Sequence, residues 1–313
     1  MRIPLSCNPG SGSTASRIHR WLGCGLMGAA VMLAAADSGA APDPALVKRG
    51  EYVFRAAGCG GCHTDVDNGG EFLAGGRALS TPFGTFYTPN ITSHPSAGIG
   101  RWTLEDFSRA LREGIAPDGR DYYPVFPYPS FTRMYQGDVA ALYAYLLSTP
   151  PVARVNRPHD LSWYISFRIS NWFWKLLFLK SGPLAPDPQR SALWNRGAYL
   201  VKALAHCGEC HTQRNRLGVL DDTMQLAGTP NGPDDETIPN ITRDQATGIG
   251  DWTRAELLEY LSLGEVPDGP YADGLMAEVV ENGLQYLSDE DLDAIVEYVW
   301  TLPAKRNDAL PDR

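Results

Sequence analysis

The chain has 313 residues, of which 43% are hydrophobic and 20% charged, a balance typical of a globular protein with one large or two modest domains. This composition excludes a wholly disordered chain, and the mean hydropathy of -0.24 excludes a polytopic membrane protein. A formal net charge of -9 argues against non-specific binding to nucleic acid.

Residues 1–41 are predicted to form a secretory signal peptide. Three arginines precede an apolar run at 21–36, and four small residues at 38–41 follow it. Because the run is short for a membrane span, we expect cleavage near its end, with an uncleaved anchor as the alternative. The mature protein should therefore lie outside the cytoplasm, either soluble or held at a membrane surface.

Two parts of the chain carry the same motifs in the same order, 148 to 153 residues apart. Five matches in one order indicate a duplicated domain rather than a solenoid array. We predict a first domain at 42–155, an aromatic linker at 156–187 and a second domain at 188–313. The matched pairs are Cys59-x-x-Cys62-His63 and Cys207-x-x-Cys210-His211, Pro89–Thr92 and Pro239–Thr242, Gly98–Trp102 and Gly248–Trp252, Pro117–Gly119 and Pro267–Gly269, and 138–145 and 291–298.

Each predicted domain begins with a helix that runs into its Cys motif and ends with an amphipathic helix bounded by proline. A long loop rich in Gly and Pro and a further helix, capped by Thr103 or Thr253, lie between them. Long loops around few helices make a poor core unless a large apolar group fills the middle, so the pattern favours an all-α fold around such a group. In chain order, the predicted terminal helices of the two domains are 46–57, 137–148, 196–205 and 289–302.

The linker stretch 161–179 is unusually aromatic. It contains three tryptophans, three phenylalanines and a tyrosine, with Arg168, Lys175 and the adjacent Lys180. These basic residues argue against a membrane span. Two interpretations stay open: an amphipathic helix packed along both domains, or a surface that docks a partner or a membrane interface.

The Cys-x-x-Cys-His pattern is the attachment signature of c-type haem, in which two thiols bond to the haem vinyl groups and the histidine binds the iron. A zinc site would need four ligands in nearby pairs, and a redox Cys-x-x-Cys would not need the histidine in both copies. The sequence therefore predicts two covalently bound haem groups. The predicted thioether residues are Cys59, Cys62, Cys207 and Cys210, and the predicted iron ligands are His63 and His211.

A sixth iron ligand is predicted only for the second domain. Met276 lies 65 residues after His211, and a Met thioether opposite a histidine suits electron transfer. The first domain has Phe126 at the matching position, and phenylalanine cannot bind iron. We expect an open or weakly ligated first haem, with Met134 on a shifted loop as the nearest alternative. His94 and His159 are remoter alternatives.

Charge is uneven along the chain. Residues 42–155 carry ten basic and eleven acidic side chains, whereas residues 188–313 carry ten basic and twenty-two acidic ones. The acidic excess of the second domain is either a solvated face that favours solubility or a docking surface for a positively charged redox partner.

These motifs resemble those of the multihaem cytochrome c subunits that partner bacterial periplasmic alcohol, aldehyde and gluconate dehydrogenases. The resemblance covers nearly all of the chain after the leader. It implies two tandem class I cytochrome c-like domains in the periplasm, with Met276 as an axial ligand beside the two motif histidines. Two features depart from the family pattern: the family commonly has three haem domains, and it usually has Met where Phe126 stands. The segments that carry the resemblance are the two Cys motifs, the Asn-Ile-Thr loops at 90 and 240, the Gly-Ile-Gly-x-Trp pairs, 123–130, 161–180, 276–280 and 286–292.

The resemblance implies a one-electron carrier that accepts electrons from a periplasmic dehydrogenase and passes them to a quinone site or a terminal oxidase. The alternative is a haem enzyme, of the dihaem peroxidase or thiosulfate-oxidising type, that uses an open first haem. We expect no enzymatic activity of the protein alone, since no Ser-His-Asp set, nucleotide loop or acidic pair is evident. No catalytic residue is assigned, and no nucleic-acid partner is expected.

Overall fold

The computed structural model describes residues 43–233, 236–267 and 269–312, and the predicted signal peptide lies outside them. We call residues 43–155 the first half and residues 188–312 the second half. The described helices are α1 (Pro44–Ala56), α2 (Cys59–His63), η1 (Val66–Asn68), α3 (Leu104–Glu113), α4 (Tyr128–Phe131), α5 (Gln136–Ser148), α6 (Ile169–Phe178), α7 (Ala192–Tyr199), η2 (Leu200–Leu204), α8 (Gly208–His211), η3 (Asp222–Met224), α9 (Arg254–Leu263), α10 (Gly274–Asn282), η5 (Leu284–Tyr286) and α11 (Asp289–Trp300).

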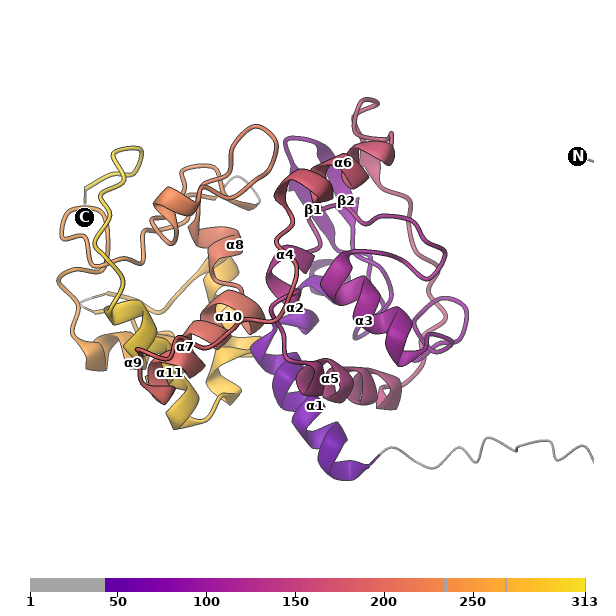
Figure 1. The fold of residues 1–313 in the computed structure, drawn as a ribbon, viewed down its shortest axis with the longest axis horizontal. Coiled ribbons are helices and arrows are strands. Elements are labelled where there is room, and N and C mark those ends of the chain that lie inside the picture. Colours follow the sequence, from indigo (N-terminus) through magenta and orange to yellow (C-terminus); the bar gives the residue numbers. More distant parts are fainter. Residues whose placement is uncertain (1–42, 234–235, 268, 313) are drawn as a thin grey trace, which may run out of the picture. The chain divides into compact units, whose positions relative to one another are not determined.

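One pair of helices forms the centre of each half. In the first half α1 packs along α5, and in the second half α7 packs along α11 (Figure 1). Each pair meets at a glycine. A Cβ atom at Gly50 would lie 1.9 Å from the Ala141 carbonyl oxygen, and one at Gly197 would lie 1.9 Å from the Ala294 carbonyl oxygen. Any larger residue would force the helices apart, so both halves depend on the same close contact.

The helix that leads into the second Cys motif contains one extra residue. Cys59 follows Tyr52 by seven residues, whereas Cys207 follows Tyr199 by eight. The helix continues beyond α7 as the π-helical turn η2, in which each hydrogen bond spans one residue more than in an α-helix. The π turn absorbs the extra residue and keeps the tyrosine and the Cys motif in register with those of the first half.

Threonines cap α3 and α9, as predicted. The Thr103 hydroxyl accepts from the Asp106 N–H while the Asp106 carboxylate accepts from the Thr103 N–H, and Thr253 and Glu256 repeat this exchange. These reciprocal bonds satisfy N–H groups that have no partner within a helix.

A small antiparallel sheet corrects the all-α prediction. β1 (Ala78–Thr81) pairs with β2 (Gly84–Tyr87), and β2 pairs with β3 (Asp160–Leu161). The Thr81 hydroxyl donates to the Gly84 carbonyl (2.7 Å) and closes the hairpin, where Gly84 has a positive φ of 119°. The strands are rich in threonine and aromatic residues, which favour a pleated surface. Within the described residues the fold is therefore mostly helical, with a hairpin in the loop that follows the first Cys motif.

The aromatic linker contains α6, and its apolar side chains are largely exposed. Trp172, Phe173, Leu176 and Leu177 have exposed fractions of 49%, 52%, 65% and 70%. The interpretation of α6 as a helix packed by its apolar face along both domains therefore fails for these side chains.

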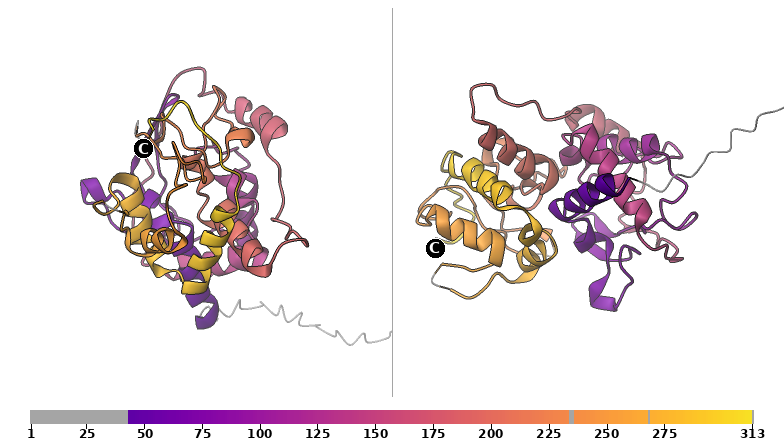
Figure 2. Two further views of the ribbon diagram at one scale, coloured as in Figure 1. Left: turned by 90° about the vertical axis from the view of Figure 1, so that its left-hand side faces the viewer. Right: turned by 90° about the horizontal axis from the view of Figure 1, so that it is seen from below.

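Two equivalent sets of three side chains, each a tyrosine, an aspartate and an arginine, join the two halves. The Tyr199 hydroxyl donates to the Asp138 carboxylate (2.6 Å), which also accepts from Arg49 of its own half (2.8 Å). In the right-hand view of Figure 2, first-half ribbons (indigo to magenta) gather on one side and second-half ribbons (orange to yellow) on the other. The second set is Tyr52, Asp291 and Arg196, with 2.6 Å between the Tyr52 hydroxyl and the Asp291 carboxylate.

Candidate haem-binding sites

Both Cys motifs lie on short helices that follow a residue with a left-handed backbone. Gly58 precedes Cys59 with a φ of 60°, and His206 precedes Cys207 with a φ of 38°. Such a conformation turns the chain sharply out of the preceding helix. Both motifs are therefore presented at a helix end by the same turn, although the second uses a histidine where the first uses glycine.

The two motif histidines have the same hydrogen bond. Nδ1 of His63 lies 2.8 Å from the Pro89 carbonyl oxygen, and Nδ1 of His211 lies 2.8 Å from the Pro239 carbonyl oxygen. Because a carbonyl can only accept, Nδ1 carries the proton and the ring lone pair is on Nε2. Burial lowers the pKa of His63, which favours the neutral ring that binds a metal. Both rings thus fit the role of an axial iron ligand with an orienting partner.

The Asn-Ile-Thr loops hold these proline carbonyls in place. The Asn90 side chain is buried and donates to the Val152 and Arg154 carbonyls. Asn240 is buried in the same way and donates to the Lys305 carbonyl. The repeat identified these loops, but their role as supports for the histidines was not predicted from the sequence.

Burial affects the acidity of the motif thiols. Burial, and then the neighbouring Cys62, raises the pKa of the Cys59 thiol to about 12, and burial raises that of Cys207 to about 11. These thiols are therefore less acidic than a free cysteine. Within the described ranges, no group of three or more His, Cys, Asp and Glu side chains is arranged to hold a metal ion by itself.

The predicted sixth-ligand positions differ between the halves. Met276 is half-buried in α10, whereas Phe126 is enclosed by the rings of Tyr122, Tyr128 and Phe131 at centroid distances of 5.7 to 6.4 Å. At the position matched by Met276, the first half therefore has an aromatic side chain in place of a thioether.

Met134 packs as a core residue. It is fully buried, and its N–H bonds to the carbonyl of Phe131 three residues earlier. Leu287, which matches it in the second half, is also buried and bonds to Leu284 at the same spacing. The two remoter histidines have structural partners: Nδ1 of His94 accepts from the Ala97 N–H, and Nδ1 of His159 accepts from the Tyr87 N–H.

The two Cys motifs lie side by side. The His206 ring forms a hydrogen bond with the Ala57 backbone, so the residues that precede the two motifs are in contact. Burial, and then the neighbouring Cys62, raises the pKa of the Cys210 thiol to about 12. The attachment residues of the two predicted haem groups therefore adjoin one another across the contact between the halves.

In each half, a residue near the predicted sixth-ligand position contacts the Cys motif of the other half or a residue bound to that motif. Arg77 is buried beside the first motif, donates to the Gly61 carbonyl (2.7 Å) and pairs with Glu278 of α10 (2.5 Å). In return, the Ser130 hydroxyl of α4 donates to Glu209 (2.5 Å), which lies inside the second motif. Sequence reasoning missed these contacts because each joins residues far apart in the chain.

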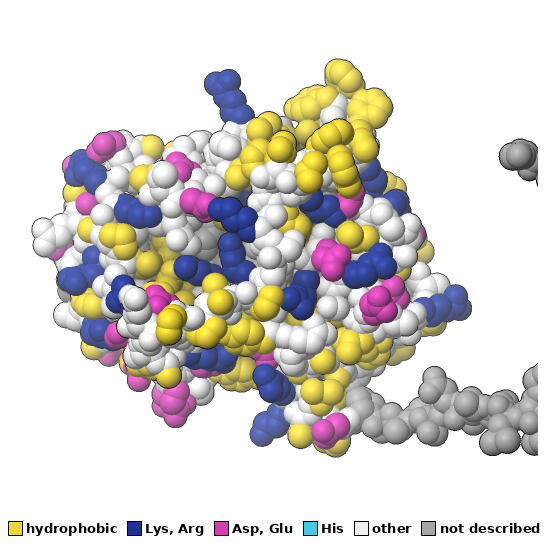
Figure 3. All heavy atoms as spheres, in the orientation of Figure 1, with side chains coloured by type: hydrophobic (Ala, Val, Ile, Leu, Met, Phe, Trp, Pro, Cys, Tyr) yellow, Lys and Arg dark blue, Asp and Glu magenta, His cyan; other side chains and the backbone are white. Residues whose placement is uncertain are grey.

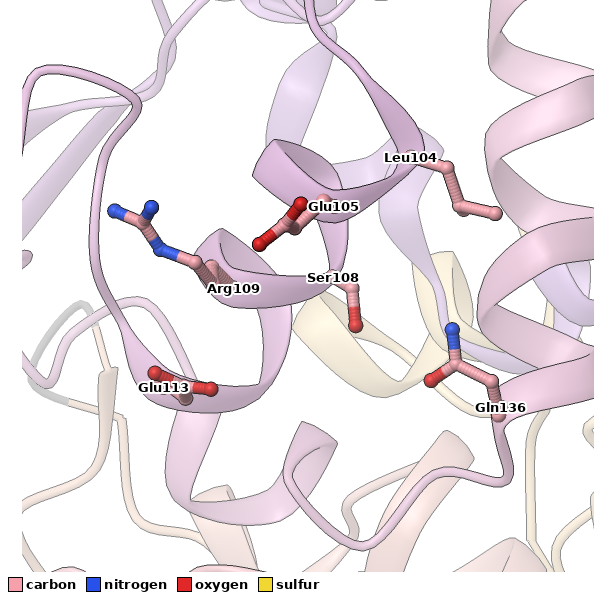
Figure 4. A pocket seen from close by; sticks show the side chains of 6 residues that line it. All are labelled: Leu104, Glu105, Ser108, Arg109, Glu113 and Gln136. Carbon is pink, nitrogen blue, oxygen red and sulfur yellow. The ribbon is translucent and has the colours of Figure 1, made fainter.

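A hollow on α3 is unrelated to these sites. It is lined by Leu104, Glu105, Ser108, Arg109, Glu113 and Gln136, side chains that are exposed or half-buried (Figure 4). None of the predicted haem-binding residues lines it.

The paired Cys-x-x-Cys-His helices, each with an oriented histidine, define a haem-binding protein of the cytochrome c class. The Cytochrome c family model matches residues 47–150. The chain is 46% identical over 264 residues to the "Diheme cytochrome c-type" protein of Cereibacter sphaeroides, an alignment that covers 82% of this chain and 86% of the relative. The chain belongs to this family of c-type cytochromes, which carry covalently bound haem.

Other relatives are longer. The fructose dehydrogenase cytochrome subunit of Gluconobacter japonicus is 44% identical, over 83% of this chain and 53% of the relative. The cytochrome c subunit of the alcohol dehydrogenase (quinone) of Gluconobacter oxydans is 39% identical, over 89% of this chain and 60% of the relative. The chain thus spans little more than half the length of these dehydrogenase subunits. Among the described residues, no helix has the length and apolar character needed to cross a membrane.

Proposed function

We propose that the protein is a periplasmic dihaem cytochrome c that accepts electrons from a dehydrogenase and passes them to a quinone site or a terminal oxidase. Each half would be one haem-binding domain, with the boundaries 42–155 and 188–313 and the linker 156–187 between them. Haem supplies reversible one-electron chemistry when bound. The residues of the chain hold it, orient its iron ligands and fix the relation between the two sites.

The adjoining Cys motifs are the observation that carries this proposal. His206 touches the Ala57 backbone, and Cys62 influences the pKa of Cys210, so the two sites share one wall. A pair of sites fixed by packed helices needs no motion of the protein between them. This arrangement suits a carrier that takes in and releases single electrons.

In each motif, the histidine and the two cysteines would have different roles in binding the haem. His63 and His211 would bind iron through Nε2, because their Nδ1 atoms are occupied by proline carbonyls. Met276 would supply the second ligand in the second half, and the aromatic cluster around Phe126 would leave the first half without a thioether at that place. The thioethers would form at Cys59, Cys62, Cys207 and Cys210.

The acidic second half is proposed as the side that meets a positively charged redox partner. Residues 188–313 carry twenty-two acidic and ten basic side chains. Attraction between unlike charges speeds encounter and weakens as salt screens it. Electron transfer with the native partner should therefore slow as ionic strength rises, and a rate independent of salt would exclude this docking surface.

Mass spectrometry of the secreted protein tests the haem count. We expect the mass of the chain plus two haem groups, and one haem fewer after Cys59→Ala with Cys62→Ala, or after Cys207→Ala with Cys210→Ala. The two double variants are matched controls for each other. A secreted chain without haem would contradict the proposal.

Reduction kinetics test the carrier role. The oxidised protein should be reduced by a dehydrogenase with its substrate and should be reoxidised by a quinone analogue or an oxidase. It should not turn over hydrogen peroxide or thiosulfate by itself. Turnover of either compound at a rate typical of enzymes would favour the alternative of a haem enzyme.

A further inference from the structure

The linker helix α6 turns its apolar stripe to the solvent. Ile169, Trp172, Phe173, Leu176 and Leu177 follow the spacing of one helix face, and their exposed fractions lie between 49% and 70%. A helix on the surface of a soluble protein normally buries such a stripe against the core. In α6 the orientation is reversed.

Polar contacts on the inner side hold α6 in this orientation. Asn171 is buried, which marks the face of α6 that lies against the protein. The Lys175 ammonium is largely buried, donates to the Glu113 carbonyl (2.9 Å) and forms an ion pair with Asp121. Rolling the helix to bury its stripe would break these contacts, so the stripe is a fixed feature of the surface.

The residues before α6 extend the exposed apolar surface. Trp163, Tyr164 and Phe167 have exposed fractions of 77%, 50% and 61%, and their rings contact one another. Leu217 joins them from the second half, because its carbonyl accepts from the Trp174 indole (2.9 Å) and its side chain is 60% exposed. Figure 3 shows these hydrophobic side chains gathered at the top of the view, where Figure 1 places α6. We call this surface the aromatic patch, defined by Trp163, Tyr164, Phe167, Ile169, Trp172, Phe173, Leu176, Leu177 and Leu217.

Charge and chemistry point to a lipid surface as the occupant. Residues 161–186 contain no Asp or Glu in a chain whose net charge is -9, and two of their basic residues, Arg168 and Lys180, are not buried. The Lys180 side chain is 82% exposed and pairs with the equally exposed Asp222 (3.1 Å). Basic residues beside an apolar face suit anionic headgroups, and Trp and Tyr favour the boundary between headgroups and acyl chains.

A protein partner fits the patch less well. Protein interfaces carry about one hydrogen bond per 100–200 Å², but the side chains of the patch offer only the indole nitrogens of Trp163 and Trp172 and the Tyr164 hydroxyl. A bilayer requires no matching polar groups. The ten residues of α6 are also far fewer than the roughly twenty that a membrane span needs. The helix is thus suited to lying on a membrane rather than crossing it.

We propose that the aromatic patch is a docking surface for a phospholipid bilayer, with α6 lying along the membrane plane. The outward stripe enters the boundary between headgroups and acyl chains, while the contacts of Lys175 keep the inner face attached to the protein. The proposal rests on the described surface alone and does not require electron transfer. Docking would hold the protein beside a membrane-bound electron acceptor.

Vesicle flotation tests the proposal. The complete secreted protein, its N-terminus defined by mass spectrometry, is mixed with vesicles of phosphatidylcholine containing phosphatidylglycerol. Replacing Phe173, Leu176 and Leu177 together by serine should lower the vesicle-bound fraction at least tenfold, because it removes three exposed apolar side chains that would be buried in the bilayer. The control is Leu263→Ser in α9, an equally exposed leucine (60%), which should bind like the parent. Each variant shares the parent's N-terminus, so any contribution from that end cancels.

A single variant, Leu177→Glu, guards against misfolding of the triple variant. It places a charge in the stripe without removing a packed side chain, and it should lower vesicle binding with an unchanged haem spectrum. Equal vesicle binding by the parent and both patch variants would overturn the proposal. A second result would also overturn it. If the parent does not bind vesicles but forms a dimer in light scattering, and the patch variants are monomeric, the patch binds a second copy of the chain.

Discussion

The two halves share the contact that joins them and differ at the site where the iron would meet its second ligand. On both sides of the contact, a tyrosine hydroxyl donates to an aspartate held by an arginine, and it accepts one backbone N–H, from Tyr135 or from Ser288. The sixth-ligand place, in contrast, is Met276 in one half and an aromatic cluster around Phe126 in the other. The shared parts set the geometry of the contact, and the parts that differ lie at the predicted sixth-ligand position.

The bridges between the halves also differ, although they connect equivalent regions. A buried arginine, Arg77, joins the first Cys motif to Glu278, whereas a serine hydroxyl joins the second motif through Glu209. Glu278 lies two residues after Met276, so α10 carries the predicted ligand of the second half and a charged residue that contacts the first half. This helix therefore links the predicted thioether ligand to the Cys motif of the first half.

Exchange of the sixth-ligand residues should have the largest effect. Met276→Phe makes the second half resemble the first, so we expect loss of the charge-transfer band of Met-ligated ferric haem. The potential of that haem should fall on the order of 0.2 V, within the span of about 0.8 V that axial ligands cover. Redox titration with optical spectra measures both, and Met224→Leu is the control within the same half.

The converse exchange sharpens the assignment of the first half. Phe126→Met should add a second Met-ligated signal, whereas Met134→Leu should leave the spectrum unchanged because Met134 matches the core residue Leu287. Loss of a Met-ligated signal in Met134→Leu would show that the first haem takes its ligand from Met134, and the inference of an open site would then be abandoned.

Removal of the buried bridge should have the next largest effect. Arg77→Met abolishes the bonds to Gly61 and Glu278, and we expect the free energy of unfolding to fall by about 3 kcal/mol, since a charged group loses several hydrogen bonds. Chemical denaturation followed by circular dichroism measures it. Arg254→Met, which breaks an exposed ion pair with Glu297, should cost at most about 1 kcal/mol. Equal losses in the two variants would show that Arg77 has no special role.

Removal of either shared tyrosine hydroxyl should have a smaller effect of similar size in both halves. Tyr52→Phe and Tyr199→Phe each delete one bond to a carboxylate (2.6 Å), worth about 1.5–3 kcal/mol of unfolding free energy. Tyr143→Phe, which loses a bond to the Trp102 carbonyl within one half, is the matched control and should cost less. If the losses of unfolding free energy in Tyr52→Phe and Tyr199→Phe differ markedly, the two contacts between the halves are not equivalent.

The sequence predicted the local features of the fold well and the long-range ones poorly. The helix caps at Thr103 and Thr253 follow from neighbouring residues, so they could be predicted and are confirmed. The contact between Tyr52 and Asp291 joins residues 239 apart, and no local pattern marks it. The outward orientation of α6 was equally hidden, because a helical period defines an apolar face without saying which way it points.

Some missed features left a signal that counting could have found. The extra residue between Tyr199 and Cys207 is visible in the sequence and requires a bulge in the helix, which the structure supplies as η2. The hairpin β1–β2 was hidden by the glycines and prolines around it, which dominate the composition of that loop. The haem-binding residues are predicted from spacing alone, but the carbonyls that contact the histidines could not be predicted, because backbone atoms carry no sequence signature.

The pH dependence of the shared contact should give the smallest effect. Burial, and then the bond to Asp291, raises the pKa of Tyr52, so its contribution to stability is complete below about pH 10 and is lost as pH rises through the folded value. Burial alone would raise the pKa of Asp291, but bonds from Arg196 and Tyr52 outweigh it and leave this pKa lowered. The carboxylate therefore contributes above about pH 4 and loses its contribution as pH falls through the folded value.

Denaturation curves from pH 3 to pH 11 for the parent and Tyr52→Phe would test this dependence. The stability difference between the two proteins should be constant near neutrality and should shrink at both ends of the range, because the bond requires a protonated tyrosine and an ionised aspartate. A difference that persists unchanged at both ends would mean that the Tyr52 hydroxyl stabilises the contact through the bond from the Ser288 N–H rather than through the bond to Asp291.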